Sequence, residues 1–406
     1  MPHAQRILIT NYILDSGTGT EMYVYDLALR LLDIGRLPVV YCPRLGMMAR
    51  RMQNKGITVV ECIDKIGEKP DLIHGHHTLE TLAAAIRFPD VPAIFVSHDC
   101  TTWHDTAPKL ANIRRYVGVD QACYDRLVFQ DGVSADIALL IPNGVHLGRF
   151  PLRKSLPVVP RSLLCFGSGF QTGDIDTVRR AVPELHVESI RARSHRPIAE
   201  PGPWLAQFDI VLARGRSARE AIATGASTIV ADGNGIGDMV TTQNYQHLHR
   251  NNFGRRLLRQ PLSIESIRKA VNQYDSIDAT RVATEHRVTN NLDNMVTQLT
   301  TLYDKVLNEG TIDPSNLESY RRQTAQCIQW ASLRANIVHA SPIADAPPPT
   351  MAIEIASRPD SSPMLNLASA PNKLIPKPNG QKRTGIVRIY REFGRAIRKL
   401  RKKKAL

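Results

Sequence analysis

Residues 208–240, FDIVLARGRSAREAIATGASTIVADGNGIGDMV, decide the fold that the sequence predicts. The apolar run Phe208–Ala213 is typical of a buried parallel strand, and Ser227–Ala231 of a second one. Between them we expect a basic turn and then a helix over Ser217–Thr224, which Gly225 ends. The three glycines between 233 and 237 predict a loop. This order places polar turn residues at the strand ends, where open α/β sheets bind their ligands.

Glu220, on the predicted helix, has two interpretations. In the functional one, its carboxylate accepts hydrogen bonds from the two hydroxyls of a ribose. In the structural one, Ser217 and Glu220 form a capping box, with serine at the N-cap and glutamate three residues later. Arg214 and Arg216 favour the functional interpretation, because they stand beside a helix N-terminus that already attracts anions. The alternative for either arginine is a solvated charge at a surface turn.

The composition is that of an ordinary globular protein. The 406 residues are enough for two domains, and 43% of them are apolar and 22% charged. The six cysteines are too widely spaced for a zinc or redox pair, so we expect reduced thiols in a cytoplasmic protein. The N-terminus runs directly into a strand, with no signal peptide and no apolar run of about 18 residues or more.

The net charge of +14 is concentrated at the C-terminus. Residues 373–406 hold 13 lysines and arginines and one acid, so they account for +12 of it. The high pI is therefore a property of the tail, and it is weak evidence that the body of the protein binds nucleic acid. The tail also lacks the interleaved aromatic residues that stack on bases, so we expect no nucleic-acid partner.

Two segments are predicted to follow the folded part. Nine prolines between 342 and 378 indicate a disordered linker over 339–383. In 384–406, apolar residues recur at three- and four-residue steps among arginines and lysines, which predicts a helix lying on an anionic membrane surface, peripheral on the cytoplasmic face. The alternatives are a basic solubilising tail or a nucleic-acid contact. The apolar residues are Ile386, Ile389, Tyr390, Phe393, Ile397 and Leu400.

The first half of the chain alternates strands and helices, which predicts a parallel sheet. Its first strand, Arg6–Thr10, leads into the glycine-bearing loop Asp15–Thr20, whose Gly17, Gly19 and Thr20 would let backbone N–H groups approach a ligand. This signal alone is weak, because the dinucleotide fingerprint is incomplete. A second α/β domain is predicted to open at Leu163–Phe166.

Histidines gather at the predicted strand ends. Their spacing does not match a metal site, so we expect no metal and read them as the polar lining of a cleft. Among them His98 ends a buried strand, where a substrate would lie; a histidine bonded to a neighbouring loop is the alternative. The cluster is His74, His76, His77, His98 and His104.

Taken together, residues 5–308 resemble the GT-B glycosyltransferases, in particular the retaining, nucleotide-sugar-dependent enzymes of family four. The order and spacing of several pieces carry the resemblance, although each piece is weak alone. They are the Gly17–Glu21 loop, Asp71–His74, the strand ending at His98, Ile141-Pro-Asn-Gly-Val145 with Phe150, Glu220-Ala-Ile-Ala-Thr-Gly225, and Leu302-Tyr303 near the end.

The resemblance implies an α/β protein with two Rossmann-like domains facing across a cleft. The acceptor would bind to the first domain and the donor nucleotide to the second. The expected segments are an acceptor domain over 1–150, a donor domain over 151–308, a closing helical segment over 309–338, the linker and the basic helix.

The resemblance also implies roles for single residues. Glu220 would hold the ribose, His98 would face the sugar, and the loop with Gly17, Gly19 and Thr20 would line the floor near the donor phosphates. Catalysis would need no metal and no other cofactor, because positioning and charge stabilisation of the departing diphosphate suffice.

The sequence departs from the family at three places, one of which is the loop with the usual phosphate ligands. Leu212 stands where a glutamate is usual, the loop Gly167–Gly173 lacks the usual arginine and lysine, and His146 replaces a common aspartate. We therefore expect Arg214 and Arg216, with Ser217 beside them, to bind the donor phosphates, since arginine binds phosphate bidentately.

Two functions are consistent with these features. The first is a glycosyltransferase, hexosyltransferase-like and retaining, that moves a sugar from a nucleotide-sugar to a glycan or lipid-linked acceptor. The second is a non-catalytic GT-B-like protein that binds a nucleotide, a glycan or an enzyme partner. Fold analogy and the basic turn favour the first.

Overall fold

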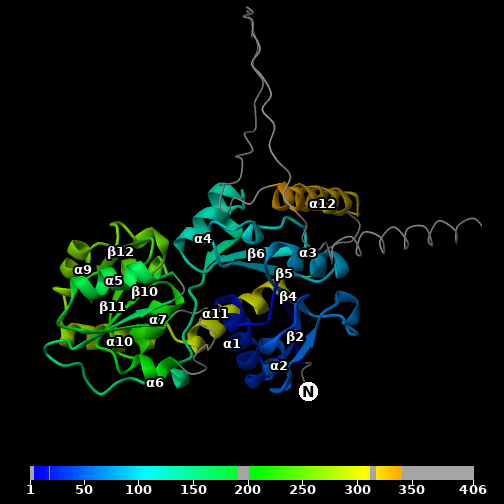
Figure 1. Ribbon diagram of the computed structural model, residues 1–406. Helices are drawn as coiled ribbons and strands as arrows, with labels where there is room; N and C mark the ends of the chain where they lie inside the picture. The colour runs from blue at the N-terminus through cyan, green and yellow to red at the C-terminus, as the bar shows by residue number, and fades with distance from the viewer. Residues whose placement is uncertain (1–3, 18, 168, 191–200, 311–316, 341–406) are drawn as a thin grey trace, which may run out of the picture. The chain divides into compact units, whose positions relative to one another are not determined.

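The computed structural model describes residues 4–17, 19–167, 169–190, 201–310 and 317–340 (Figure 1). This part of the chain forms two β-sheets with helices between most successive strands, and both sheets belong to one compact unit. The predicted α/β class with a strand–helix alternation is therefore confirmed.

The first sheet has the strand order β3-β2-β1-β4-β5-β6-β7 within the described ranges, and every neighbouring pair is parallel. β4 and β5 are buried along their whole length, as expected for strands covered on both faces. The strands are β1 (Arg6–Thr10), β2 (Leu37–Tyr41), β3 (Thr58–Val60), β4 (Leu72–His76), β5 (Ala93–Ser97), β6 (Ile113–Gly118) and β7 (Ala138–Leu140). The helices are α1 (Gly19–Asp33), α2 (Met47–Gln53), α3 (Thr78–Arg87) and α4 (Gln121–Asp125), which continues as a π-helix over Arg126–Gln130.

The second sheet has the order β12-β11-β10-β8-β9 in the described residues. The four strands predicted before residue 232 are present and parallel to one another. The strands are β8 (Ser162–Phe166), β9 (His186–Ile190), β10 (Ile210–Ala213), β11 (Ser227–Asp232) and β12 (Gly235–Met239). The helices are α5 (Thr172–Ala181), α6 (Pro201–Leu205), α7 (Arg216–Ala223), α8 (Tyr245–Arg250), α9 (Ile264–Val271) and α10 (Ser276–Thr289).

The loop predicted for the glycines between 233 and 237 is wrong, because β12 forms there and pairs antiparallel with β11. Ile236 on β12 is buried opposite Ala231. A Cβ on Gly237 would lie 2.3 Å from the carbonyl oxygen of Leu257, so only glycine lets the strand approach this segment. The glycines here serve close backbone packing rather than a loose turn.

The capping box predicted for Ser217 and Glu220 is also wrong. Helix α7 begins one residue earlier, at Arg216, and its N-cap is Gly215, whose φ of 59° favours glycine. No side chain caps this end of the helix. Glu220 is therefore one turn inside the helix, four residues after Arg216, and its carboxylate bonds to that side chain instead.

Helix α11 (Leu292–Asn308) follows the second sheet in sequence but packs into the core of the first. Its buried residues recur at three- and four-residue steps, and they share one core cluster with residues of α1 and β1. Tyr303 also forms a hydrogen bond to the first sheet, because its hydroxyl lies 2.5 Å from Nδ1 of His74 on β4. The domain boundaries predicted at residues 150 and 308 stay predictions.

The chain passes between the two sheets at two places, and these segments are hydrogen-bonded to each other. Val145 on the outward segment donates to the carbonyl of Asn290 and accepts from the N–H of Leu292, both at 2.9 Å. A Cβ on Gly144 would lie 2.5 Å from the carbonyl oxygen of Asn291. The predicted Pro142-Asn-Gly144 turn thus needs its glycine for this contact.

The predicted closing helix is α12 (Leu317–Ala340), which ends two residues beyond the expected Val338. Its Tyr320 hydroxyl donates to the carbonyl of Ala85, so α12 contacts α3. Most of the predicted linker and all of the basic helix 384–406 lie outside the described residues. None of the described helices is long and apolar enough to span a membrane.

Burial of α11 leads to a stability prediction. Replacing Leu299, which is fully buried, by alanine leaves a cavity, and we expect the free energy of unfolding to fall by about 2–5 kcal/mol. Gln298→Ala on the exposed face of the same helix is the matched control, for which we expect a change within about 0.5 kcal/mol. Urea unfolding measures both; equal effects would contradict the packing of α11 in this core.

Candidate functional site

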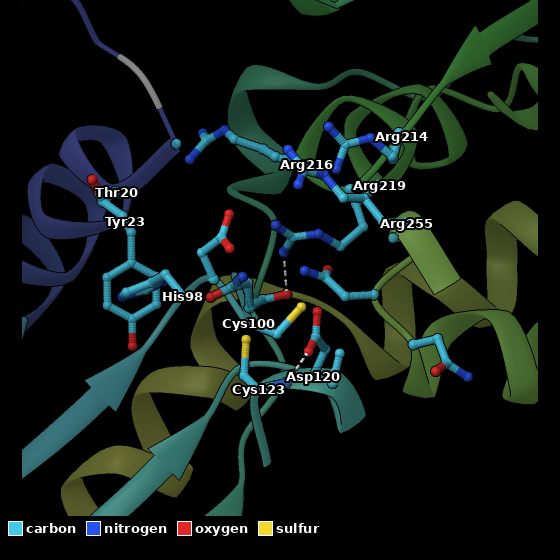
Figure 2. A pocket seen from close by; sticks show the side chains of 18 of the residues that line it. Thr20, Tyr23, His98, Cys100, Asp120, Cys123, Arg214, Arg216, Arg219 and Arg255 are labelled. Atoms are coloured by element: carbon cyan, nitrogen blue, oxygen red, sulfur yellow. Dashed lines mark hydrogen bonds between the residues drawn. The ribbon is translucent and has the colours of Figure 1, made fainter. Parts of the chain in front are cut away.

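A pocket of about 360 Å³ is lined by residues from both sheets. They come from the start of α1, from the segments after β5, β6 and β10, from the loop 251–256 and from the start of α11, so the pocket lies where parallel strands end. In Figure 2, Tyr23 and His98 approach from elements of the first sheet, and the labelled arginines from the second. A cavity is therefore present at the strand ends where the sequence predicted a site, and the roles of its residues stay predictions.

The structure brings five of the predicted site residues together at this pocket. They are Gly19, Thr20, His98, Arg214 and Arg216. Gly17, Ser217 and Glu220 are not among the lining residues. Gly17 instead shapes the loop before α1: it has a φ of 75°, and its N–H donates to Oε2 of Glu21 at 3.1 Å.

Glu21 is buried and holds this loop in place. Its carboxylate also accepts from the N–H of Asp15 at 2.5 Å and from Oγ of Ser16 at 3.2 Å. A carboxylate that accepts several such bonds at the start of a helix orders the loop and complements the helix dipole. The loop therefore reaches the pocket through Gly19 and Thr20, which come first in α1.

Arg216 is held by two carboxylates. Its Nε donates to Oε1 of Glu220 at 2.6 Å, and its guanidinium lies 3.6 Å from the carboxylate of Asp26 on α1. Asp26 also pairs with Arg149. Glu220 is thus engaged with a cation of its own helix, although no described residue donates a hydrogen bond to its Oε2.

Arg214 is also neutralised. Its Nε donates to Oδ2 of Asp232 at 2.6 Å, and Asp232 is buried at the end of β11. The two arginines that the sequence singled out therefore enter the pocket already paired with carboxylates. An anion there would have to compete with Asp232 and Glu220.

Arg219 is a pocket residue that the sequence alone did not single out. It is 4% exposed, lines the pocket, and has no carboxylate of a described residue within ion-pair distance. Its Nη1 donates to the carbonyl of Asn143 at 2.5 Å, and its buried Nε has no partner. Burial and then the charge of Arg216 lower the pKa of Arg219 to about 9. The signal was present, because Arg219 follows Arg216 by three residues and shares its helix face.

The loop 251–256 supplies two further arginines. Its backbone is strained, with φ near 50° at Asn252 and Phe253, and the carbonyl of Phe253 accepts from the N–H of Gly215 at 2.8 Å. Strained backbone of this kind is concentrated at functional sites. Arg256 pairs with Asp125, whereas Arg255 has no carboxylate partner among the described residues.

His98 lies at the pocket and is bonded to the buried interior. Its backbone N–H donates to Oδ1 of Asp105 at 2.9 Å, and its Nε2 lies 2.8 Å from Nδ1 of His76. Burial raises the pKa of Asp105 to about 6. Burial, followed by the nearby His77 and His74, keeps the pKa of His98 well below its usual range. The imidazole is therefore neutral at pH 7.

The histidines at the strand ends do not form a metal site in the described residues, where no group of three or more His, Cys, Asp or Glu side chains could hold a metal ion. They stack and bond with one another instead: the rings of His74 and His76 are 4.5 Å apart, and His104 stacks on Tyr12 at 5.8 Å. Only His98 of this cluster lines the pocket.

Comparison with known proteins supports the fold. No family model matches the sequence, and no curated protein matches it. A crystal structure of a glycosyltransferase from Rickettsia africae ESF-5 is similar, with a TM-score of 0.54 at 12% identity over 75% of this chain and 99% of that chain. The MurG protein of Acinetobacter baumannii (TM-score 0.46, 11% identity, 74% and 99% covered) and a UDP-N-acetylglucosamine 2-epimerase (0.45, 12%, 73% and 95%) are more distant. At such low identity the first likeness shows the fold alone, which is of the GT-B type.

The buried histidines predict an acid sensitivity that can be isolated at His74. Burial lowers its pKa from 6.5 to about 3, so between these values the unfolded chain binds one more proton than the folded protein. The contribution of His74 to the free energy of unfolding is therefore fully present above pH 6.5 and is lost as the pH falls. The free energy of unfolding of His74→Gln should therefore rise relative to that of wild type by about 1.4 kcal/mol for each pH unit below pH 6.5.

Urea unfolding of both proteins at pH 7.5 and 5.5 measures this difference. The same substitution at the exposed His247 is the control, since it removes no buried imidazole. A His74→Gln difference that does not change between the two pH values would show that His74 is not buried as a neutral ring.

Proposed function

We propose that this protein is a glycosyltransferase that binds a nucleotide-sugar in the pocket and transfers the sugar to a glycan or lipid-linked acceptor. The observation that carries the proposal is Arg219, a buried guanidinium that lines the pocket and has no carboxylate of a described residue within ion-pair distance. An unpaired buried charge is costly, so a bound anion would stabilise it.

The donor diphosphate is the anion that fits this position best. A guanidinium offers several N–H donors in one plane, and the buried Nε of Arg219 has no partner. Arg255 is a second cation at the same pocket, and no described carboxylate pairs with it. In this proposal, Arg219 and Arg255 do the work expected of Arg214 and Arg216, whose charges are balanced by Asp232 and Glu220.

The charges of the pocket suit a departing diphosphate. Charge that develops on the leaving group would be stabilised by arginines that are already in place. His98 is neutral, so it would contribute a hydrogen bond to the substrate rather than a charge. The hexosyl donor and the retaining stereochemistry are carried over from the resemblance in sequence; anomeric analysis of the product tests the latter.

Glu220 keeps its proposed role as ribose ligand in a modified form. Its Oε1 is bonded to Arg216, whereas Oε2 accepts no hydrogen bond from a described residue and is the atom that a ribose hydroxyl would use. Because Glu220 does not line the pocket, the ribose would have to reach beyond the present cavity.

The alternative is a non-catalytic protein that binds a nucleotide, a glycan or an enzyme partner. It is favoured by Leu212, which is fully buried on β10 where the related enzymes have an acid. Release of sugar from a nucleotide-sugar, to an acceptor or to water, separates the two functions. A binder would show affinity without turnover.

The proposal predicts how ligands change the melting temperature. UDP, GDP, ADP and their sugars form the panel, because a ligand that binds only the folded state raises the midpoint. The corresponding nucleosides are the reference, and we expect one base to stabilise the protein far more as its diphosphate than as its nucleoside. Arg219→Gln should weaken the diphosphate by about 1.5–3 kcal/mol, roughly 10- to 100-fold, and leave the nucleoside little changed.

Arg179→Gln, on the exposed face of α5, is the matched control and should bind like wild type. Removal of an unpaired buried charge should not lower the melting temperature of the free Arg219→Gln protein. If Arg219→Gln binds the diphosphate as wild type does, Arg219 is not a phosphate ligand. If no nucleotide binds, the glycosyltransferase proposal fails.

We also propose that residues 384–406 bind an anionic membrane surface, on the basis of their amphipathic pattern. Each basic residue near such a surface contributes about 1 kcal/mol, and this attraction is screened by salt. The full chain should sediment with anionic vesicles at low salt, and a chain truncated after residue 340 should not. A full chain with Phe393→Ser and Ile397→Ser keeps its charge, so retained binding would indicate charge alone. No sedimentation of the full chain at low salt would refute the proposal.

A further inference from the structure

His76 and His98 come from neighbouring parallel strands of the first sheet. His76 ends β4, and His98 follows the end of β5, so the two rings meet at the edge where the pocket lies. Nδ1 of His76 and Nε2 of His98 are 2.8 Å apart, which is a hydrogen-bond distance. One of the two nitrogens must therefore carry the proton, and the other must accept it.

The surroundings of His76 decide which nitrogen carries the proton. His76 is fully buried, and its other ring nitrogen, Nε2, has no partner. Buried N–H groups without an acceptor are rarer in proteins than buried acceptors without a donor. The proton of neutral His76 therefore belongs on Nδ1, which donates to His98.

The proton position on His76 also determines which ring nitrogen of His98 is protonated. Its Nε2 accepts the bond from His76, so a neutral His98 carries its own proton on Nδ1. No described residue bonds to this Nδ1, and it is not one of the buried atoms without a partner, so it is open to the pocket that His98 lines. Burial keeps the pKa values of both histidines well below their usual range, and so both rings are neutral at pH 7.

Aromatic packing keeps the two rings in this arrangement. The ring of Tyr23 meets His98 at 4.8 Å and 76° and His76 at 5.1 Å and 78°, so both imidazoles pack edge-to-face against one tyrosine. His74 lies against the other histidine, His76, at 4.5 Å. Rotation of His98 about its ring axis would replace the bond to His76 by a carbon contact.

We infer that His76 is a positioning residue that holds His98 as its Nδ1–H tautomer, so that His98 donates a hydrogen bond into the pocket and does not act there as a base. The group that it would recognise is an oxygen acceptor of the bound ligand, a hydroxyl or a phosphate oxygen. This last step rests on the proposed function, whereas the tautomer itself does not.

The tautomer can be measured directly in the full chain without a substrate. In protein labelled with ¹⁵N-histidine, long-range proton–nitrogen correlation distinguishes a protonated ring nitrogen from a bare one, and His98→Gln identifies the signals of His98. At pH 7.5 we expect Nδ1 of His98 to be protonated and Nε2 to be bare, in a single form. A wild-type His98 protonated mainly on Nε2 would overturn the inference.

Two substitutions of His76 test the positioning role. His76→Asn places an amide N–H close to the position of Nδ1, so His98 should remain in its Nδ1–H form. His76→Leu removes the donor, and His98 should then become a mixture of tautomers. If His98 in His76→Leu stays a single Nδ1–H form, His76 does not determine it. Absence of nucleotide binding would leave these spectra unchanged, so failure of the proposed function is distinguishable from failure of this inference.

Discussion

The structure depends on the hydrogen bonds between the two segments that connect its sheets. Val145 on the outward segment bonds to Asn290 and Leu292 on the return segment, and Gly144 is a glycine because a side chain would collide there. The return segment continues into α11, which completes the core of the first sheet. The first sheet therefore lacks part of its core without a helix that follows the second sheet in sequence.

The same contact shapes the pocket. Asn143, just before this junction, offers its carbonyl to Arg219, and Leu292, just after it, lines the cavity together with Met295. A buried cation is thus held by backbone at the junction rather than by a carboxylate. The difference matters for the charge of the site, because a backbone carbonyl orients a guanidinium without neutralising its positive charge.

The sequence predicted the α/β class and most of the parallel strands, but not the chemistry of the site. Apolar runs and their spacing predicted the parallel strands, because burial on both faces requires such runs. Charge balance could not be predicted, since Arg214 and Asp232 meet only when β10 and β11 pair. The role of Gly237 in β12 could not be predicted for a related reason. It depends on a close contact with Leu257, a residue that is distant in sequence.

His98 shows which functional property the sequence can predict and which it cannot. The strand-end position of His98 could be recognised from the sequence, because strand ends collect ligands. Its protonation could not, since that depends on His76 and on a buried nitrogen that only the fold leaves without a partner. A residue's place in a site follows from local pattern, whereas its chemical state follows from neighbours that tertiary structure supplies. In this pocket the chemical state of the side chains matters most. A neutral N–H donor on His98 and the Arg219 guanidinium, which no described carboxylate pairs with, both favour an electron-rich oxygen ligand.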